Sequence, residues 1–452
     1  MFVEFLPLLM FAVLMLLVFT SYPIGFVLGG VAVLFGIIGW QAGVFSLIEF
    51  FNFLPRIWMI ADNFAIIAVP LFVFMGVMLE RSEIAKDLLE TLQILLRRVP
   101  GGMAMAVTVM ATIFAAITGV VGASVVVMTL IALPPMLRAG YRPTLALGTI
   151  AASSTLGILI PPSILLVFLA ELLPMSIGML FAAALYPGLL LSGLYLFYIG
   201  AYTMIVPEAA PRMPAQNDRL SAAEIFPIFI RGVLPPVVLI SMVLGSILTG
   251  FVTITESAAV GAAGAMVLAL ARGKLNLATL TDCLRRSAMM IGMIFFLFIG
   301  ATCFSYVFRV LGGDELILAL VNEAGLSNWG ILVVAILLIF VMGFFFDVLE
   351  ILLVVVPVFA PLVALLDFGG HVPQADVIYW FAILVAITLQ TSFLTPPMGL
   401  ALFYVKGVSP ESVTMSQIYV GIIPFVILQL TCVSLVMAFP DIAMWLPHRL
   451  FD

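Results

Sequence analysis

Charged residues are scarce in this sequence: Asp, Glu, Lys and Arg make up 9% of its 452 positions, whereas 65% of the residues are hydrophobic. Soluble domains are about half apolar and about a quarter charged. The shortage of charge excludes a soluble globular protein and predicts an all-α polytopic membrane protein in contact with the lipid bilayer. At about 20 apolar residues per span, the length allows roughly ten to twelve spans.

Cysteine, histidine and the common catalytic motifs are also rare or missing. The three cysteines (Cys283, Cys303 and Cys432) are scattered and have no histidine nearby, which argues against disulfides and zinc sites. The sequence lacks a GxxxxGK[ST] loop and an HExxH motif, so we expect neither direct ATP drive nor an enzyme, and no nucleic-acid partner. The first residues carry no basic region or cleavage site, and we expect a first span rather than a removed signal peptide.

Proline breaks two apolar stretches that are otherwise long enough to cross the bilayer. Residues 156–164 (LGILIPPSI) and 392–400 (SFLTPPMGL) each contain a Pro-Pro pair. Proline lacks the N–H of a helical hydrogen bond and clashes with the preceding turn, so a helix breaks there. Bare carbonyls at membrane depth survive only against protein or a water-filled cavity. One such break in each half of a chain points to the binding site of a transporter.

Two further stretches predict re-entrant helical hairpins, which enter the membrane and return to the same side. Residues 103–137 form two apolar arms around a Gly-, Ser- and Thr-containing tip at 118–124, and basic residues flank both outer ends. Arms of about 15 residues are short of the about 20 that a span needs. Residues 329–342 and 351–366 repeat this plan around a second tip at 343–350.

The other elements complete two similar halves, joined by a polar linker at residues 206–231. Hydropathy and helical spacing predict broken spans at 143–173 and 376–405, amphipathic interfacial helices at 81–98 and 275–286, and unbroken spans at 3–20, 24–45, 62–80, 176–202, 232–250, 256–271, 288–308 and 415–438.

Charge predicts the orientation of this plan. All but three of the 17 Lys and Arg residues fall on one side, the exceptions being Arg56, Arg309 and Arg449. The positive-inside rule makes that side the cytoplasm and places both termini outside. The first hairpin then opens to the cytoplasm and the second to the exterior, so the two halves are inverted repeats.

Each hairpin tip pairs with the neighbouring break to form a candidate ion site. Unwound carbonyls at a break can coordinate Na⁺, and half-helix N-termini can face an anion. The first set is Gly119, Gly122, Ser124, Gly157, Ile160 and Pro161, and the second is Gly343, Ser392, Thr395 and Met398. The structural alternative is that these glycines and prolines only permit close helix packing.

Anion recognition must come from helix N-termini, bound ions and hydroxyl groups, because no Lys or Arg falls at the predicted midplane. The candidate hydroxyls are Ser124, Ser163, Thr391 and Thr395. Asp347 and Glu350 are the ionisable residues placed deepest, and such residues are functional by default in a membrane. Asp347 has an alternative role as a helix cap at the start of the returning arm.

Several of these stretches resemble the large membrane subunit of the tripartite ATP-independent periplasmic (TRAP) transporters, within the ion transporter superfamily. The matching segments run in order from about residue 100 to the end: ITGVVGAS, LPPMLRAGY, LGILIPPSI, GFVTITESAAV, GFFFDVLEILLVVVPVFAPLV and TSFLTPPMGLALF. The chain departs from the pattern at Ser392, where many members have Gly, and at its first tip, which is serine-rich in many members.

The resemblance implies an elevator-type transporter of the bacterial inner membrane. Scaffold and arm helices would occupy residues 1–99 and 232–310, and the transport domain residues 100–205 and 311–452. It also implies Na⁺-driven uptake of a small organic anion such as a carboxylate, with two Na⁺ sites on the sets given above. A periplasmic binding protein would deliver the substrate, and a small four-helix membrane subunit would pair with this chain. A stand-alone carrier of the same fold, coupled to Na⁺ or H⁺, and a channel remain as alternatives.

Overall fold

A computed structural model describes residues 3–20, 22–118, 121–173, 175–211, 222–397 and 399–451, and these residues form helices and no strands. Five of the described helices are long and apolar enough to cross a bilayer, or up to seven if each bent pair is one span. Most of the remaining apolar helices are the shorter arms of the hairpins and of the broken spans. The predicted all-α membrane fold is thus confirmed.

The first scaffold segment contains one more helical stretch than the sequence predicts. It consists of η1 (Val3–Phe5), α1 (Leu6–Val18), α2 (Ile24–Gln41), η2 (Leu47–Asn52), α3 (Phe53–Ala61), α4 (Phe64–Arg81) and α5 (Ile84–Leu96). The stretch at η2 and α3, which lies between the predicted spans 24–45 and 62–80, is helical. Its rings pack at edge or tilted angles, Phe50 on Phe45 and Phe53 on Tyr306, although no residue of η2 or α3 is fully buried.

The first hairpin and the first broken span form as predicted. They comprise α6 (Gly102–Thr118), α7 (Val121–Arg138), α8 (Pro143–Ser154), η3 (Thr155–Ile158) and α9 (Ile164–Leu172), followed by α10 (Ile177–Ile205) and η4 (Pro207–Ala209). The Pro161–Pro162 bond in the break is cis. Helices α8 and α21 (Met415–Ala438) cross closely at two glycines. A Cβ on Gly148 would lie only 2.0 Å from the Gly421 carbonyl oxygen, so the crossing requires glycine there.

The second scaffold segment differs from the prediction in three places. It contains α11 (Ala222–Gly232), α12 (Leu234–Leu248), α13 (Ile254–Ala271), α14 (Leu277–Val310) and α15 (Gly313–Glu323). Helix α11 lies within the predicted linker, and its strong amphipathicity explains why it packs on α5. The predicted interfacial helix and third span are one continuous 34-residue helix, α14, because no proline separates them. Helix α15 was not predicted.

The second hairpin and broken span repeat the plan of the first. They comprise α16 (Asn328–Met342), α17 (Val348–Val354), α18 (Val356–Ala364), α19 (Val377–Ser392) and α20 (Leu400–Val408), followed by α21 and α22 (Asp441–Phe451). The Pro396–Pro397 bond is also cis. Helix α22, which the sequence did not predict, packs on α10, and its His448 Nε2 lies 2.9 Å from Asp376 Oδ2.

The two hairpins open at opposite ends of α10. The ends of the first hairpin meet where the Tyr141 hydroxyl accepts a hydrogen bond from Met103 N (3.2 Å), and they lie beside the C-terminal part of α10. The ends of the second meet where Asn328 Nδ2 donates to the Asp367 carbonyl (2.6 Å), near Trp380. The adjacent Tyr379 hydroxyl accepts from Ser176 N, at the start of α10 (3.1 Å). The predicted inverted arrangement is confirmed.

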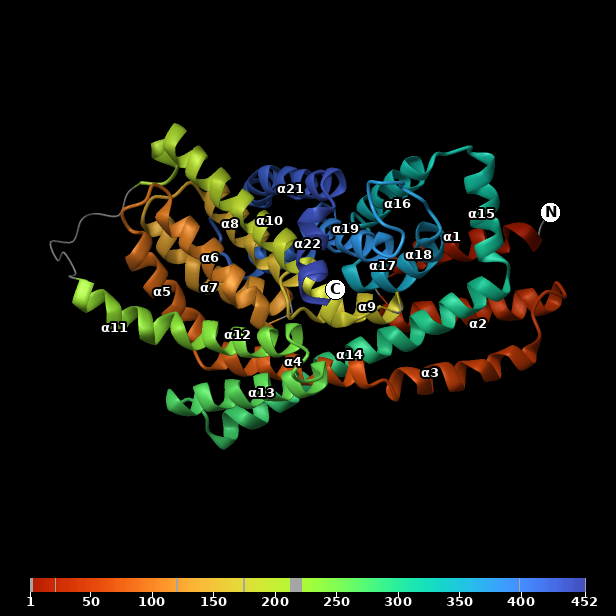
Figure 1. Cartoon of the computed structure of the whole chain (residues 1–452), viewed down its shortest axis with the longest axis horizontal. Coiled ribbons are helices and arrows are strands. Elements are labelled where there is room, and N and C mark those ends of the chain that lie inside the picture. Colours follow the sequence, from red (N-terminus) through yellow and green to blue (C-terminus); the bar gives the residue numbers. More distant parts are fainter. Residues whose placement is uncertain are drawn as a thin grey trace.

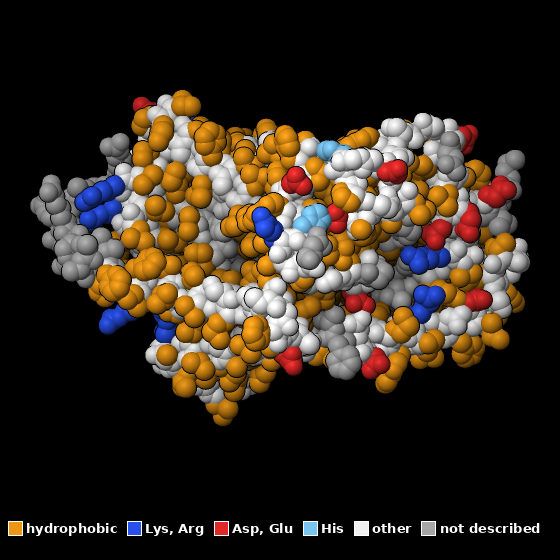
Figure 2. Space-filling view, viewed as in Figure 1, with side chains coloured by type: hydrophobic (Ala, Val, Ile, Leu, Met, Phe, Trp, Pro, Cys, Tyr) orange, Lys and Arg blue, Asp and Glu red, His pale blue; other side chains and the backbone are white. Residues whose placement is uncertain are grey.

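Charge is distributed unevenly along the molecule. The two hairpins lie toward opposite ends of the long axis, with α5 and α11 at the end of the first (Figure 1). Figure 2 shows most of the visible Lys and Arg side chains at that end and most Asp and Glu over the other half. Ion pairs join the two scaffold segments there: Arg81 with Asp282, and Lys274 Nζ with Glu83 Oε1 at 2.8 Å. The hydrogen bond from Lys274 lowers the pKa of Glu83.

Candidate functional site

The first hairpin tip lies against the first break. Both α6 and α7 contact η3, the last turn before the break. Beyond η3 the chain is non-helical until Ser163, whose buried hydroxyl donates a 2.6 Å hydrogen bond to the Ile158 carbonyl. Ile160 packs under Gly188 of α10, where a Cβ would lie 2.8 Å from Ile160 Cγ1. The break is therefore held by packing and by one short side-chain bond to its own backbone.

The second hairpin tip approaches the second break more closely. A Cβ on Gly343, just after α16, would lie 2.3 Å from Ser392 Oγ at the end of α19. Ser392 is buried, and its hydroxyl has no hydrogen-bond partner among the described residues. Thr391 and Thr395 donate to the carbonyls of Thr388 (2.6 Å) and Thr391 (2.9 Å). This contact brings together two members of the second predicted ion set, Gly343 and Ser392.

Asp347 caps the returning arm of the second hairpin. It forms a capping box at the start of α17, in which the Asp347 amide donates to Glu350 Oε2 at 3.3 Å. The capping alternative for Asp347 is thus observed, and Glu350 takes part in it. With Ser392, both carboxyl groups also line a small cavity of about 210 Å³.

A larger cavity of about 460 Å³ lies where both tips, both breaks and the scaffold meet. Four of its lining residues are the first residues of helices that begin there: Val121 of α7, Ile164 of α9, Val348 of α17 and Leu400 of α20. A helix N-terminus presents unpaired N–H groups and a partial positive charge. The N-termini of α9 and α20 carry no side-chain cap, whereas Asp347 caps that of α17, so the uncapped helix ends beside this cavity favour a negatively charged occupant.

The cavity contains only some of the predicted residues. Gly122 and Asp347 line it, and Ser124, Ser163, Glu350, Thr391 and Thr395 do not. The lining also lacks the predicted ion ligands Gly157, Ile160 and Pro161 of the first break, Gly343 of the second tip, and Ser392 and Thr395 of the second break. Gly119 and Met398 lie outside the described residues. No group of three His, Cys, Asp or Glu side chains that could hold a metal ion occurs in the described part of the chain, so an ion here would need backbone carbonyls.

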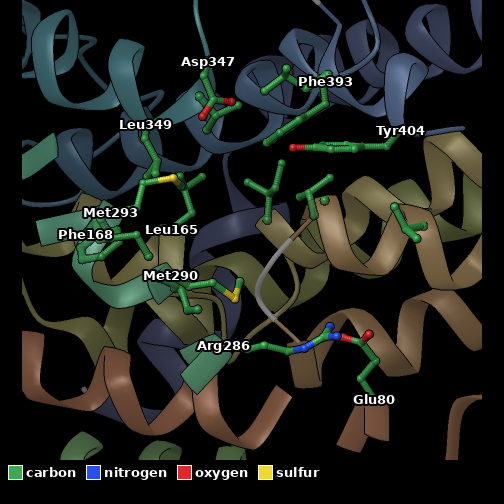
Figure 3. A pocket seen from close by; sticks show the side chains of 18 residues that line it. Glu80, Leu165, Phe168, Arg286, Met290, Met293, Asp347, Leu349, Phe393 and Tyr404 are labelled. Atoms are coloured by element: carbon green, nitrogen blue, oxygen red, sulfur yellow. The ribbon is translucent and has the colours of Figure 1, made fainter. Parts of the chain in front are cut away.

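Three polar residues of the cavity were missed by the sequence reasoning. Tyr404 of α20 stands over Gly122, its Cε2 atom 3.1 Å from where a glycine Cβ would be. Arg286 of α14 and Glu80 of α4 point toward each other on the side opposite Tyr404 and Asp347 (Figure 3). Arg286 Nε is also 3.1 Å from Asp282 Oδ2. In the sequence, Glu80 ends the predicted span 62–80, Arg286 ends the predicted interfacial helix 275–286, and Tyr404 lies in the predicted broken span 376–405.

A second cavity, of about 580 Å³, lies beside α3, α4, α9 and α14. Several polar side chains line it, among them Arg56, Asp62, Asn63, Glu171 and Arg309. One face of α14 runs through both cavities. The two are separated by a ring contact between Phe168 of α9, which lines the first, and Phe298 of α14, which lines the second, with centroids 4.6 Å apart.

Comparisons with known proteins agree with this architecture. Residues 11–442 match the family described as "Tripartite ATP-independent periplasmic transporter, DctM component". The chain is 29% identical to the C4-dicarboxylate TRAP transporter large permease protein DctM of Pseudomonas aeruginosa, over 86% of this chain and 88% of that one. It is 30% identical to the ectoine/5-hydroxyectoine large permease UehC of Ruegeria pomeroyi (86% and 87%). The solved Alcanivorax borkumensis YdaH transporter shares the fold, with a TM-score of 0.60 at 14% identity, covering 89% of this chain and 88% of that one.

Proposed function

The chain belongs to the TRAP transporter family, as its DctM component, and we propose that it imports a small carboxylate-bearing organic anion together with Na⁺. Membership of this family makes it a multi-pass inner-membrane permease and not an enzyme. The proposal adds the ion, the substrate class and an elevator mechanism. We also propose that the end of the molecule that carries α5 and α11 faces the cytoplasm, which places both termini outside.

The helix N-termini at the 460 Å³ cavity, above all the uncapped ends of α9 and α20, carry the substrate assignment. Their N–H groups can bind carboxylate oxygens at membrane depth without a buried lysine or arginine. Arg286, Glu80, Asp347 and Tyr404 also line the cavity, and most of its remaining walls are apolar, with Phe168, Met290 and Met293 among them. This lining suits an anion that has a small hydrocarbon body, and Tyr404 offers a hydroxyl beside it.

Na⁺ would bind behind the cavity, at the two tip–break contacts. The backbone carbonyls at Gly157 and Ile160 and at Ser392 and Thr395 are the oxygen donors that hard cations prefer. The ions would hold the tips against the breaks and so complete the wall from which the helix N-termini face the anion. Na⁺ and the anion are then bound and released together, which is the basis of symport.

The two cavities support the elevator mechanism. They lie along one face of α14, with the Phe168–Phe298 contact between them. In the proposed orientation, the 580 Å³ cavity lies toward the outside and the 460 Å³ cavity toward the cytoplasm. Movement of α9 and its neighbours along that face of α14 would carry the bound anion from the first position to the second. A periplasmic binding protein would supply the anion, and a small membrane subunit would support the scaffold, as family membership implies.

Uptake of a radiolabelled C4-dicarboxylate into proteoliposomes that contain this chain, the small subunit and the binding protein tests the function. With outside Na⁺ replaced by K⁺, we expect uptake to fall by about fivefold to about 150-fold, the usual range of coupling between two ligands. Equal uptake in both salts would disprove Na⁺ coupling. Full uptake without the binding protein would favour the stand-alone carrier.

Replacement of Ser163 by Ala should impair transport more than folding. The variant loses the 2.6 Å bond to the Ile158 carbonyl, which holds the break in shape beside the cavity. One lost hydrogen bond of about 1 kcal/mol predicts a roughly fivefold rise in the KM for the anion. Ser154→Ala is the matched control, because its buried hydroxyl bonds the Ile150 carbonyl at 2.7 Å within α8. Equal kinetics of the two variants would remove Ser163 from the site.

A further inference from the structure

Two polar side chains meet where the two broken helices cross. Thr155, the first residue of η3, and Gln390, near the end of α19, are fully buried. Thr155 Oγ1 lies 3.5 Å from Gln390 Oε1, and Gln429 Nε2 of α21 lies 3.5 Å from the same hydroxyl. Burial of a polar group lowers stability unless the group is hydrogen-bonded. The presence of two buried polar side chains between these apolar helices therefore suggests a function.

The pair occupies equivalent positions in the two repeats. Thr155 and Gln390 are 235 residues apart, the same separation as Pro161 and Pro396. In an inverted repeat, equivalent residues can touch only on the pseudo-two-fold axis. Each of the two also stands two residues before a proposed ion ligand, Gly157 in one half and Ser392 in the other. The contact is therefore a direct polar link between the two breaks.

The hydrogen bonds of this cluster are not all made. The Thr155 hydroxyl has one proton, and it donates to the Ala152 carbonyl at 2.8 Å, so the 3.5 Å contact to Gln390 is an alternative for the same proton. Gln390 Nε2 and Gln429 Oε1 have no partner among the described residues. Most buried polar atoms in proteins are paired. A small shift of η3 toward α19 would exchange the donation to the Ala152 carbonyl for a donation to Gln390 Oε1.

We propose that Thr155 and Gln390 act as positioning residues that make Na⁺ binding at the two breaks cooperative. The inference rests on the proposed Na⁺ coupling. An ion at the first break fixes the carbonyls of Gly157 and Ile160, and through them the position of η3. Thr155 then bonds Gln390, which orders the last turn of α19 and the Ser392 and Thr395 carbonyls for the second ion. The link works equally in the other direction, as thermodynamic coupling requires.

The Na⁺ dependence of uptake by the complete three-component transporter tests the coupling. Two coupled sites give a sigmoidal curve with a Hill coefficient approaching about two in the wild type. Thr155→Val, which keeps the shape and removes the hydroxyl, and Gln390→Leu should each lower it toward about one. Thr155→Ser retains the hydroxyl and should restore the sigmoidal curve.

Thr388→Val is the matched control for a merely structural effect. Thr388 is buried on α19, two residues before Gln390, and its hydroxyl bonds only the Leu384 carbonyl, at 2.8 Å. If Thr155 has only a structural role, Thr155→Val and Thr388→Val should both lower the melting temperature and the maximal rate and leave the Hill coefficient unchanged. That result would overturn the inference. A wild type that is indifferent to Na⁺ would instead refute the proposed function itself, and the inference with it.

Discussion

Replacing Gly343 with alanine should reduce uptake to the background of empty liposomes, although the variant should still insert and fold. The φ of −60° and ψ of −16° at Gly343 suit any residue, so only space requires glycine here. The added methyl group would lie 2.3 Å from Ser392 Oγ and 3.0 Å from Ser392 Cβ. The second tip must then move off α19, and a displacement of about 1 Å at a site can cost about 100-fold in rate. Proteoliposome uptake and thermal unfolding in detergent would measure the two effects.

A compensating change at Ser392 sharpens this experiment. The double variant Gly343→Ala/Ser392→Gly moves the side chain from one partner to the other and should recover most of the uptake. Gly407→Ala, on α20, is the matched control, because nothing lies within 4 Å of its added Cβ. Failure of the double variant to recover, together with normal melting, would show that the contact between tip and break does not control transport.

Local steric chemistry explains what the sequence could reveal about this fold. The Pro161–Pro162 and Pro396–Pro397 pairs prevent helical hydrogen bonds wherever they occur, so both broken spans could be predicted from residue type alone. The amphipathic helix α5 could also be predicted from local sequence, because its apolar residues recur at helical spacing. The continuity of α14 could not be predicted in this way. Its first part has an amphipathic pattern and its later part is apolar, but this change of pattern does not interrupt the helical backbone.

The candidate site was less accessible to sequence reasoning. Ser163, Thr391 and Thr395 were selected as hydroxyls near the breaks, but in the structure each bonds a carbonyl of its own segment, as such residues commonly do near helix ends. Tyr404 and Arg286 line the cavity because distant helices meet there, and no local pattern encodes that meeting. The backbone part of the site followed from Gly and Pro, whereas its side-chain lining depended on tertiary packing.

A covalent link between α9 and α14 should abolish transport reversibly. Phe168 and Phe298 are buried ring partners that belong to the proposed transport domain and the scaffold. If α9 must slide along α14, then Phe168→Cys/Phe298→Cys bridged by Hg²⁺ should hold the two domains in this arrangement. Uptake should fall to background and return when dithiothreitol removes the metal. The three native cysteines, which are buried and free, are first replaced by alanine.

A bridge within a single helix controls for labelling damage. Phe304 and Phe308 stack one turn apart on α14, with ring centroids 6.3 Å apart, so a Phe304→Cys/Phe308→Cys bridge joins two points that do not move relative to each other. We expect that variant to keep its uptake in Hg²⁺, because only a bridge across the domain boundary restrains the sliding motion. Undiminished uptake by a fully bridged Phe168→Cys/Phe298→Cys protein would exclude sliding at this contact and favour a fixed pathway, in which the two aromatic rings open locally to let the anion pass.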